Sequence, residues 1–443
     1  MQPFQGWDLI PDLTQGGSRT RNPGLRDGIP LGFDDRQMRV VGNEEAGSTH
    51  SKFTRFSHAK IQWALLALVS LAMLAACLRC ASAQLAPALP LVDVFVNGQD
   101  GYPAFRIPAL ITTKRGSLLA FAEGRASLSD HAENDIVLKR STDGGKTWGP
   151  LQIIHEDGTN TLGNPTAVVV RETGRVLLMY QRYAAGFDEH KAEPGLDGSR
   201  ICRTLIQHSD DDGGTWSKPV EVTTQVKRPV EVTSTATGPG IGIQLARGKH
   251  AGRILMPFNQ GPYGKWKVYA VFSDDGGESW LYGETAPEGA EGHANEVQFV
   301  ELRDGSVMLN ARNQGGGEKF RKIATSRDGG ETWSTTRHDA TLIEPVCQAS
   351  ILRHPGQGDP TKDVFLFSNP ATQTGRTNGT IRLSRDEGKT WPVSRVLYPG
   401  GFAYSCLASL PDGAIGCLFE RDGTKKIAYA RFTVNWIESK ADE

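Results

Sequence analysis

From about residue 91 onward, apolar and polar residues alternate in short runs that are each ended by a turn. The stretch FRIPALITTKRGSLLAFAEGR, residues 105–125, shows the unit: an apolar strand, a polar turn containing glycine, and a second apolar strand. Comparable stretches begin at residues 164, 234, 295, 347 and 404. The pattern therefore predicts six β-hairpins and an all-β fold.

A second repeated element lies between the hairpins. It has the form Ser-x-Asp-x-Gly-x-Thr/Ser-Trp and occurs as STDGGKTW at 141, SDDDGGTW at 209, SDDGGESW at 273, SRDGGETW at 326 and SRDEGKTW at 384. An Asp side chain accepts hydrogen bonds from backbone amides just ahead of it, and Gly adopts the positive φ of a tight turn. The Trp supplies a large apolar group for burial. Turn chemistry accounts for every position of the repeat, so we interpret it as structural.

One hairpin plus one Ser-Asp turn gives four antiparallel strands, which is the composition of a propeller blade. We therefore predict that residues 84–443 form a six-bladed β-propeller of four-stranded antiparallel blades. The run LVDVFV, residues 91–96, lies outside the hairpins. We expect this N-terminal strand to close the ring as the outer strand of the last blade, which has no Ser-Asp turn of its own.

Residues 1–83 form a leader of different character. An apolar run of 16 residues, 63–78, is preceded by basic residues and followed by the small-residue stretch Cys80-Ala81-Ser82-Ala83. This order is typical of a secretory signal cleaved after Ala83. A lipoprotein box at 74–77 and an uncleaved signal anchor are the alternatives. We expect a secreted, periplasmic or cell-surface protein, with any membrane attachment confined to residues 60–80.

Charge and cysteine content exclude several classes of protein. The 443 residues carry a net charge of −1, which does not suit a polycation built to bind nucleic acid. No group of residues has metal-ligand spacing, and we expect neither a metal nor an organic cofactor. If Asp412-Gly413 is a two-residue turn, Cys406 faces Phe419 and Cys417 faces Ala408. The two cysteines are then diagonal neighbours, and no disulfide is assigned.

Strand direction predicts which side chains share one rim of the propeller. Residues that open a first strand, close a second strand or precede a third strand lie on the rim opposite the Ser-Asp turns. They include Arg106, Arg125, Asp130, Glu296, Arg312, Arg376 and Tyr404. Arg106, Arg312 and Arg376 come from three different blades, and three converging guanidinium groups would bind a carboxylate strongly. For any one of them, a surface ion pair is the alternative.

The chain resembles a known family in these same residues. Phe105-Arg106-Ile107-Pro108, the five Ser-Asp turns, Phe121-Ala122-Glu123-Gly124-Arg125 and Ala403-Tyr404-Ser405 are similar to an exo-α-sialidase (neuraminidase) of the bacterial and animal type. The resemblance runs from about residue 91 to the end. The turns alone occur in many other propellers, whereas the combination of Phe-Arg-Ile-Pro with the tyrosine is specific.

The resemblance implies a catalytic set that elementary chemistry also favours. Sialic acid carries a carboxylate on its anomeric carbon, which would repel an anionic nucleophile. Tyr404 is expected to attack as a neutral phenol whose proton passes to Glu296, giving a covalent intermediate; sialidases are in this respect an exception to the two-carboxylate rule of glycosidases. A packed aromatic and an arginine partner are the structural alternatives for these two residues.

The remaining roles rest on the same resemblance. Asp130, in Leu-Ser-Asp-His, is expected to be the general acid and then the base for water. Asp135 competes with it but begins a strand, where a local pair is more plausible. Arg125 is expected to contact the C4 hydroxyl of the sugar, and Glu123 to orient Arg106 or Arg125.

These expectations describe a retaining exo-α-sialidase that acts on sialylated glycoconjugates. A lectin-like propeller that binds sialosides without cleaving them is one alternative, although it would not need a nucleophile and a base. A trans-sialidase that passes the sugar to another hydroxyl is a second alternative, because exclusion of water depends on how loops and aromatic residues are placed.

Overall fold

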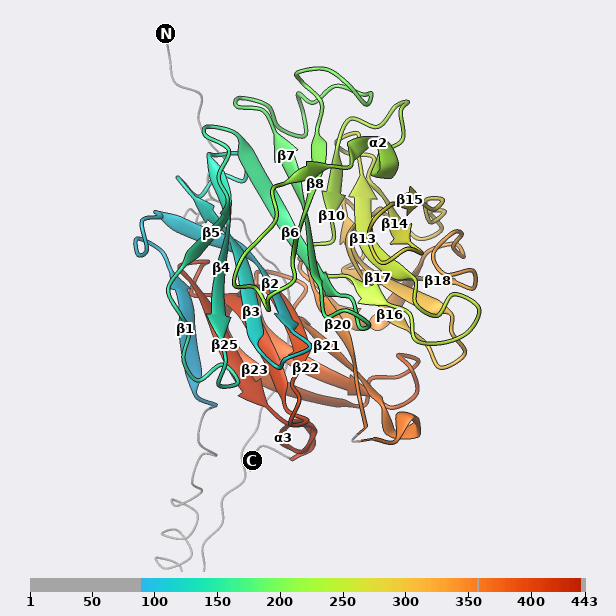
Figure 1. Ribbon diagram of the computed structural model, residues 1–443. Helices are drawn as coiled ribbons and strands as arrows, with labels where there is room; N and C mark the ends of the chain where they lie inside the picture. The colour runs from blue at the N-terminus through green and yellow to red at the C-terminus, as the bar shows by residue number, and fades with distance from the viewer. Residues whose placement is uncertain (1–88, 357, 440–443) are drawn as a thin grey trace, which may run out of the picture. The chain divides into compact units, whose positions relative to one another are not determined.

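The computed structural model describes residues 89–356 and 358–439, in which strands far outnumber helices (Figure 1). Internal contacts divide the chain into Met1–Arg79 and Cys80–Glu443. The predicted signal sequence, its cleavage after Ala83 and the export that follows from them lie outside the described residues and stay predictions. Within the described ranges, every helix is too short or too polar to cross a membrane.

Pairing arranges most strands in sets of four antiparallel neighbours. The first three sets are β2 (Ala104–Thr112), β3 (Leu118–Arg125), β4 (Asn134–Ser141) and β5 (Gln152–His155); β6 (Thr161–Val169), β7 (Val176–Tyr183), β8 (Arg203–Ser209) and β9 (Val220–Glu221); and β10 (Thr235–Thr237), β13 (Ile254–Gln260), β14 (Lys267–Ser273) and β15 (Leu281–Tyr282). The short strands β11 (Gly240–Ile241) and β12 (Ile243–Gln244) pair with β6 and β13. The predicted hairpins at 105, 164 and 234 fall in these sets.

The remaining sets follow the same plan. They are β16 (His293–Glu301), β17 (Val307–Gln314), β18 (Phe320–Ser326) and β19 (Arg337–Ile343); β20 (Ser350–His354), β21 (Val364–Pro370), β22 (Thr377–Ser384) and the start of β23 (Val393–Ser409); and the end of β23, β24 (Ile415–Arg421), β25 (Lys426–Phe432) and β1 (Leu91–Val96). Strand β23 pairs with β22 through its first half and with β24 through its second half. The helical segments are α2 (Thr223–Val226), α3 (Val434–Glu438) and the 3-10 turn η1 (Pro360–Lys362).

The N-terminal strand joins the C-terminal end of the chain, as the sequence predicts. Strand β1 pairs antiparallel with β25, with Leu91 opposite Ala430 and Val96 opposite Lys426. Figure 1 shows the blue β1 beside the red β25. Phe95 is fully buried in a cluster that also contains residues of β3, β6 and β24. Burial of this alternating apolar strand removes the exposed edge of β25 from solvent.

All five Ser-Asp turns have the structural role that their composition predicts. Asp143 accepts hydrogen bonds from the backbone and hydroxyl of Thr147, and the other box aspartates accept the same pair of bonds from the residue four positions on. The hydroxyl of Ser141 caps the turn at the amide of Gly145, whose φ is 87°. The turns follow the third strands, away from the predicted rim.

The last hairpin differs from its predicted register by one residue. Cys406 is opposite Leu418 and Cys417 is opposite Leu407, because residues 411–413 form a three-residue loop with Gly413 at φ 80°. The prediction of a two-residue turn, with Cys406 facing Phe419, was therefore wrong. Residues 406 and 407 point to opposite faces of the strand, so Cys406 and Cys417 lie in different core clusters. Both are free thiols.

Four first strands carry an irregularity near the predicted rim. The register shifts between Arg106 and Ala109 in β2, between residues 163 and 166 in β6, between residues 294 and 297 in β16, and between residues 402 and 405 in β23. Ile107 lies inside the first of these with φ 63°, which is uncommon for a β-branched residue. Such bulges bend a strand and redirect its side chains. Arg106, Glu296 and Tyr404 all lie at these bulges.

Candidate active site

A phenol and a carboxylate from distant parts of the sequence meet at this rim. The Tyr404 hydroxyl donates a hydrogen bond to Oε1 of Glu296 across a separation of 108 residues. Arg312 Nη1 donates to Oε2 of the same carboxylate at 2.8 Å and to the Tyr404 oxygen at 3.2 Å. Tyr404 and Glu296 are only 6% and 7% exposed. The sequence predicts that these three residues share one rim, and in the structure they are in direct contact.

The environment of Tyr404 keeps its proton on the oxygen. Burial, followed by the negative charge of Glu296, holds the pKa of Tyr404 well above its ordinary value, and the charges of Arg312 and Arg376 oppose this effect. The phenol is therefore neutral in the free protein. Glu296 is in place to accept the proton if the oxygen attacks an electrophile.

The three predicted arginines surround this phenol. The guanidinium carbons of Arg106 and Arg376 lie 5.3 and 5.5 Å from the centre of the Tyr404 ring, while Arg312 reaches its hydroxyl. They come from β2, β17 and the residue before β22. The side chains of Arg106 and Arg312 are 13% and 15% exposed. Three positive groups around one phenol can bind a carboxylate with several charge-assisted hydrogen bonds.

Glu420 organises this group and was not among the predicted site residues. Its Oε1 accepts from Arg106 Nε at 2.6 Å and from the Ile107 amide at 2.9 Å, and its Oε2 accepts from the Tyr404 amide at 3.2 Å. The residue is fully buried. Glu420 closes the second strand of the last hairpin, the position that Arg125 and Arg312 occupy in theirs. The same rim rule would have found it.

Glu123 orients Arg125. The Nε and Nη2 atoms of Arg125 both pair with Oε2 of Glu123, the former at 2.7 Å, while Arg106 pairs with Glu420 instead. Arg125 is only 1% exposed. The contact of Arg125 with the sugar stays a prediction.

Asp130 lies between Arg125, which pairs with Glu123, and Arg106, which pairs with Glu420. Its Oδ1 accepts from Arg125 Nη1 at 2.8 Å and lies 3.7 Å from Arg106 Nη1. The side chain is 70% exposed, so it is accessible from solvent. Desolvation raises the pKa of Asp130, but the charges of Arg125 and Arg106 outweigh it and leave the pKa below its ordinary value. Asp130 is consequently ionised in the free protein at neutral pH.

The competing residue Asp135 has a local partner, as expected from its position in β4. Its Oδ2 accepts from the Tyr102 hydroxyl at 2.7 Å, and Asp135 is only 7% exposed. The site shows no contact between Asp135 and the three arginines. Asp130 is therefore the better placed of the two for proton transfer at this rim.

Glu189 is a further acidic group near the site that sequence reasoning missed. It lies between β7 and β8, and burial, followed by the negative charges of Glu296 and Asp130, raises its pKa to about 7, although a hydrogen bond with Trp266 opposes the shift. No motif marks this residue in the sequence. Its position near Glu296 and Asp130 comes entirely from a segment whose path only the tertiary structure defines.

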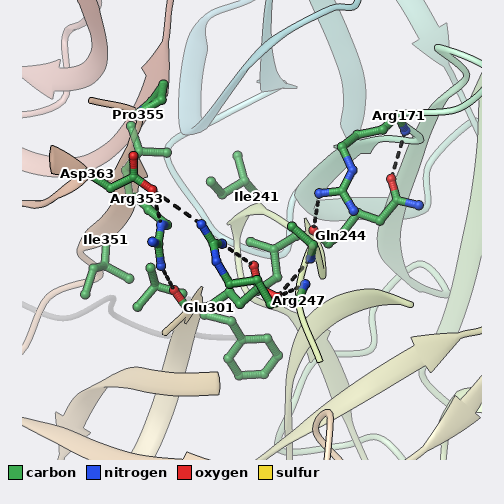
Figure 2. Close-up of a pocket in the computed structure, with 14 residues that line it drawn as sticks. Arg171, Ile241, Gln244, Arg247, Glu301, Ile351, Arg353, Pro355 and Asp363 are labelled. Carbon is green, nitrogen blue, oxygen red and sulfur yellow. Dashed lines mark hydrogen bonds and ion pairs between the residues drawn. The ribbon is translucent and has the colours of Figure 1, made fainter. Parts of the chain in front are cut away.

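A cavity of about 240 Å³ contains none of these residues. It is lined by residues at the other ends of the first strands, including Glu301 and Arg353, and its charged groups pair with one another (Figure 2). Arg247 lies 2.9 Å from Glu301, and Arg353 lies 2.7 Å from Asp363. Both acids of the cavity are therefore paired with arginines that also line it. Across the described residues, no cluster of His, Cys, Asp or Glu is arranged to hold a metal ion.

The repeated strand sets and turns define a β-repeat protein, and residues 116–417 match the BNR repeat-like domain. A sialidase of Micromonospora viridifaciens is 38% identical over 356 residues, which cover 78% of this chain and 54% of that protein. An exo-alpha-sialidase of Aspergillus fumigatus is 31% identical over 373 residues, covering 76% and 86%. The solved structure of a Hadza microbial sialidase matches with a TM-score of 0.71 at 33% identity, covering 78% and 69%. The chain belongs to the sialidase family.

Proposed function

We propose that this protein is a retaining exo-α-sialidase that removes terminal α-linked sialic acids from glycoproteins, glycolipids or oligosaccharides. The observation that carries the proposal is the contact between Tyr404, Glu296 and Arg312 inside a ring of three arginines. A site that only bound sialosides would need the arginines but would not need a buried phenol paired with a base. The chain spans about half of the Micromonospora relative, 54%.

The geometry supports a two-step mechanism. Arg106, Arg312 and Arg376 would hold the carboxylate of the sugar and so present its anomeric carbon to the Tyr404 oxygen. As that oxygen forms a bond to the carbon, its proton passes to Glu296, and Asp130 protonates the departing glycosidic oxygen. In the second step Asp130 takes a proton from water, the water oxygen bonds to the anomeric carbon, and Tyr404 leaves with the proton returned by Glu296.

Asp130 must change its protonation state before it can act as the acid. In the free protein Arg125 and Arg106 lower its pKa. A substrate carboxylate placed on Arg106 would cancel part of that positive field, and the sugar would displace water from the exposed Asp130 side chain. Both effects raise the pKa of a carboxyl group. Substrate binding would therefore prepare Asp130 to donate its proton.

We also propose that the strand sets are the blades of a six-bladed propeller. The described residues contain six sets of four antiparallel strands, and β1 joins the last of them to the N-terminal end of the chain. In a propeller, first strands from all blades approach a common axis. That arrangement explains why Arg106, Glu296 and Tyr404, each near the start of a first strand, lie together.

Replacement of Tyr404 by Phe tests the proposal. Hydrolysis of an aryl α-sialoside should fall by roughly three orders of magnitude or more, because the nucleophile is lost while the arginines remain. Weak binding of a sialic acid analogue should persist. Tyr429→Phe is the matched control, since this buried phenol donates to the carbonyl of Gly144, far from the arginines. Full activity of the Tyr404 variant would eliminate it as the nucleophile.

The first product released by the wild-type protein distinguishes the reaction types. The reaction is followed by NMR. If free α-sialic acid appears before its β-anomer, the reaction is a retaining hydrolysis. A 2,7-anhydro product would mean that an internal hydroxyl of the sugar, and not water, attacks the intermediate. Binding without release of the aryl group would contradict the enzymatic proposal.

A further inference from the structure

A four-residue segment, 344–347, opens the connection from β19 to β20, residues 344–349, and lies near two of the three arginines. The carbonyl of Val346 accepts a hydrogen bond from Arg376 Nη2 at 3.1 Å. On the other side, Glu344 Oε1 accepts from the backbone amide of Asn313 at 2.6 Å, and Asn313 directly follows Arg312. One short segment is therefore bonded both to the Arg376 side chain and to the strand that carries Arg312.

The segment is held by a buried ion pair that the proposed mechanism does not use. Arg321 Nη1 lies 2.6 Å from Glu344 Oε2, and the two side chains are 0% and 1% exposed. The same Nη1 donates to the carbonyl of Cys347 at 2.6 Å, and Arg321 Nε donates to Oδ1 of Asn310 at 2.7 Å. Arg321 therefore binds both ends of the segment and also β17. A buried ion pair is tolerated only with such additional hydrogen bonds.

The backbone of the segment is in an unfavourable conformation. Val346 has a φ of 57°, which a β-branched residue rarely adopts. The neighbouring bonds from Arg321 to Cys347 and from Asn313 to Glu344 hold this conformation in place. Positive φ at a bulky residue persists only where the surroundings fix it, and here it accompanies the carbonyl that receives Arg376.

We propose that the buried Arg321–Glu344 pair is a positioning device that sets the spacing between Arg312 and Arg376 and thereby the affinity for the substrate carboxylate. This inference rests on the proposed function of the arginine ring. Neither Arg321 nor Glu344 touches the Tyr404–Glu296 pair. Cys347 packs in one buried cluster with Tyr404, but its hydrogen bond to Arg321 does not pass through Glu344. Loss of the Glu344 charge should therefore change how the carboxylate is held more than it moves the nucleophile.

The variant Glu344→Gln tests this role. Gln keeps an oxygen for the Asn313 amide and nearly the same volume, but removes the charge that fixes Arg321. We expect KM for an aryl α-sialoside to rise about tenfold with kcat changed less than about threefold, because the carboxylate is held equally in the ground state and the transition state. Arg321→Lys, which keeps the charge but loses the planar fork, should shift KM in the same direction.

Glu301→Gln is the matched control. Glu301 is also a buried glutamate, and it accepts from the backbone amides of Ala246 and Arg247 and from the Arg247 side chain (Figure 2). It lies at the opposite end of β16 from Glu296. Its substitution should lower the melting temperature without changing KM.

Binding provides a readout that loss of stability alone would not produce. The affinity of the wild-type protein for an unsaturated sialic acid analogue should greatly exceed its affinity for the matching carboxamide. In Glu344→Gln this ratio should fall by about the same factor as KM rises, while in Glu301→Gln it should not change. The proposal is wrong if both the affinity ratio and KM are unchanged in Glu344→Gln and Arg321→Lys. It is also wrong if kcat falls by the same factor as kcat/KM, because KM is then unaffected.

The two proposals fail separately. If the wild-type protein binds the analogue but releases no product, the enzymatic function is wrong, and the affinity ratio still decides the role of the ion pair. If the wild-type protein turns over normally and the ratio is unaffected by the Glu344 variant, only the positioning role is wrong.

Discussion

At the scale of single residues, the site depends on one buried phenol that cannot ionise without help. Burial and the charge of Glu296 raise the pKa of Tyr404, and Glu296 is the only base that its hydroxyl contacts among the described hydrogen bonds. Glu420 fixes the backbone of Tyr404 and the side chain of Arg106 together. Glu296 pairs with Arg312 and Glu420 pairs with Arg106, so two of the three positive charges are already paired in the free protein.

The raised pKa of Glu189 leads to a prediction about how stability depends on pH. The folded-state pKa of about 7 lies above the ordinary value of 4.5. Folding therefore favours the protonated form, and stability is lost as the pH rises from about 4.5 through 7. The melting temperature of Glu189→Gln should match that of the wild type at pH 4 and exceed it at pH 8. The difference should be about 2–4 °C for each kcal/mol by which the substitution raises the free energy of unfolding.

Thermal unfolding at the two pH values checks this expectation. Glu193→Gln is a suitable control, because Glu193 lies in the same segment, is half exposed and pairs with Arg200. A Glu189 variant that is less stable than the wild type at pH 8 would show that the charged form is favoured after all.

At the scale of elements, two devices shape the strands. Bulges near the start of first strands redirect side chains towards the site, and the Ser-Asp turns at the other end of third strands hold the loops. The turns are satisfied by their own residues, as in Asp211, which accepts from the amide and hydroxyl of Thr215 at 2.8 and 2.7 Å. The bulges therefore lie near the candidate site, and the Ser-Asp turns lie at the opposite ends of the strand sets.

Asp211→Ala and Asp210→Ala separate these roles within one turn. Asp211 accepts three hydrogen bonds inside the turn, so its loss should destabilise the protein by roughly 1–2 kcal/mol. Asp210 makes an exposed ion pair with Arg175, and its loss should cost about 0.5 kcal/mol or less. KM should be unchanged in both variants when measured below the melting temperature. Equal destabilisation by the two variants would contradict the assigned role of the box aspartate.

At the scale of the whole described unit, the two ends of the fold are joined by β1 and β25. Phe95 of β1 is fully buried, and its ring centre lies 5.2 Å from that of Phe105 in β2. The N-terminal strand therefore contacts both the last and the first strand set. This closure is long-range in sequence, and contacts of this kind are associated with slow folding.

Phe95→Ala tests whether β1 is part of the cooperative core. The substitution should cost about 3–5 kcal/mol and lower the melting temperature of the entire unit in a single transition. Val92→Ala, on the same strand but only partly buried opposite Tyr429, should cost much less. A small effect of the Phe95 variant, or separate melting of the N-terminal strand, would show that β1 is peripheral.

The sequence by itself determined the features that depend on local periodicity. Alternating residues placed the hairpins, the Ser-Asp turns marked the third strands, and strand direction assigned Arg106, Arg312, Arg376, Glu296 and Tyr404 to one rim. These inferences succeed because side-chain direction in a strand follows from the position along it. The one-residue error at Cys406 arose where the length of a turn, and not the pattern of the strand, set the register.

Only the tertiary structure decided which charges are partners. Arg106 and Glu420 are 314 residues apart, and no local pattern links them; the same holds for Glu189, whose pKa is raised by burial and by the charges of Glu296 and Asp130. The role of the segment 344–347 is likewise invisible in the sequence, because its hydrogen bonds join β17, β18 and the approach to β22. Electrostatic energy depends on distance and burial in space, and those are set by the assembly of all the strand sets together.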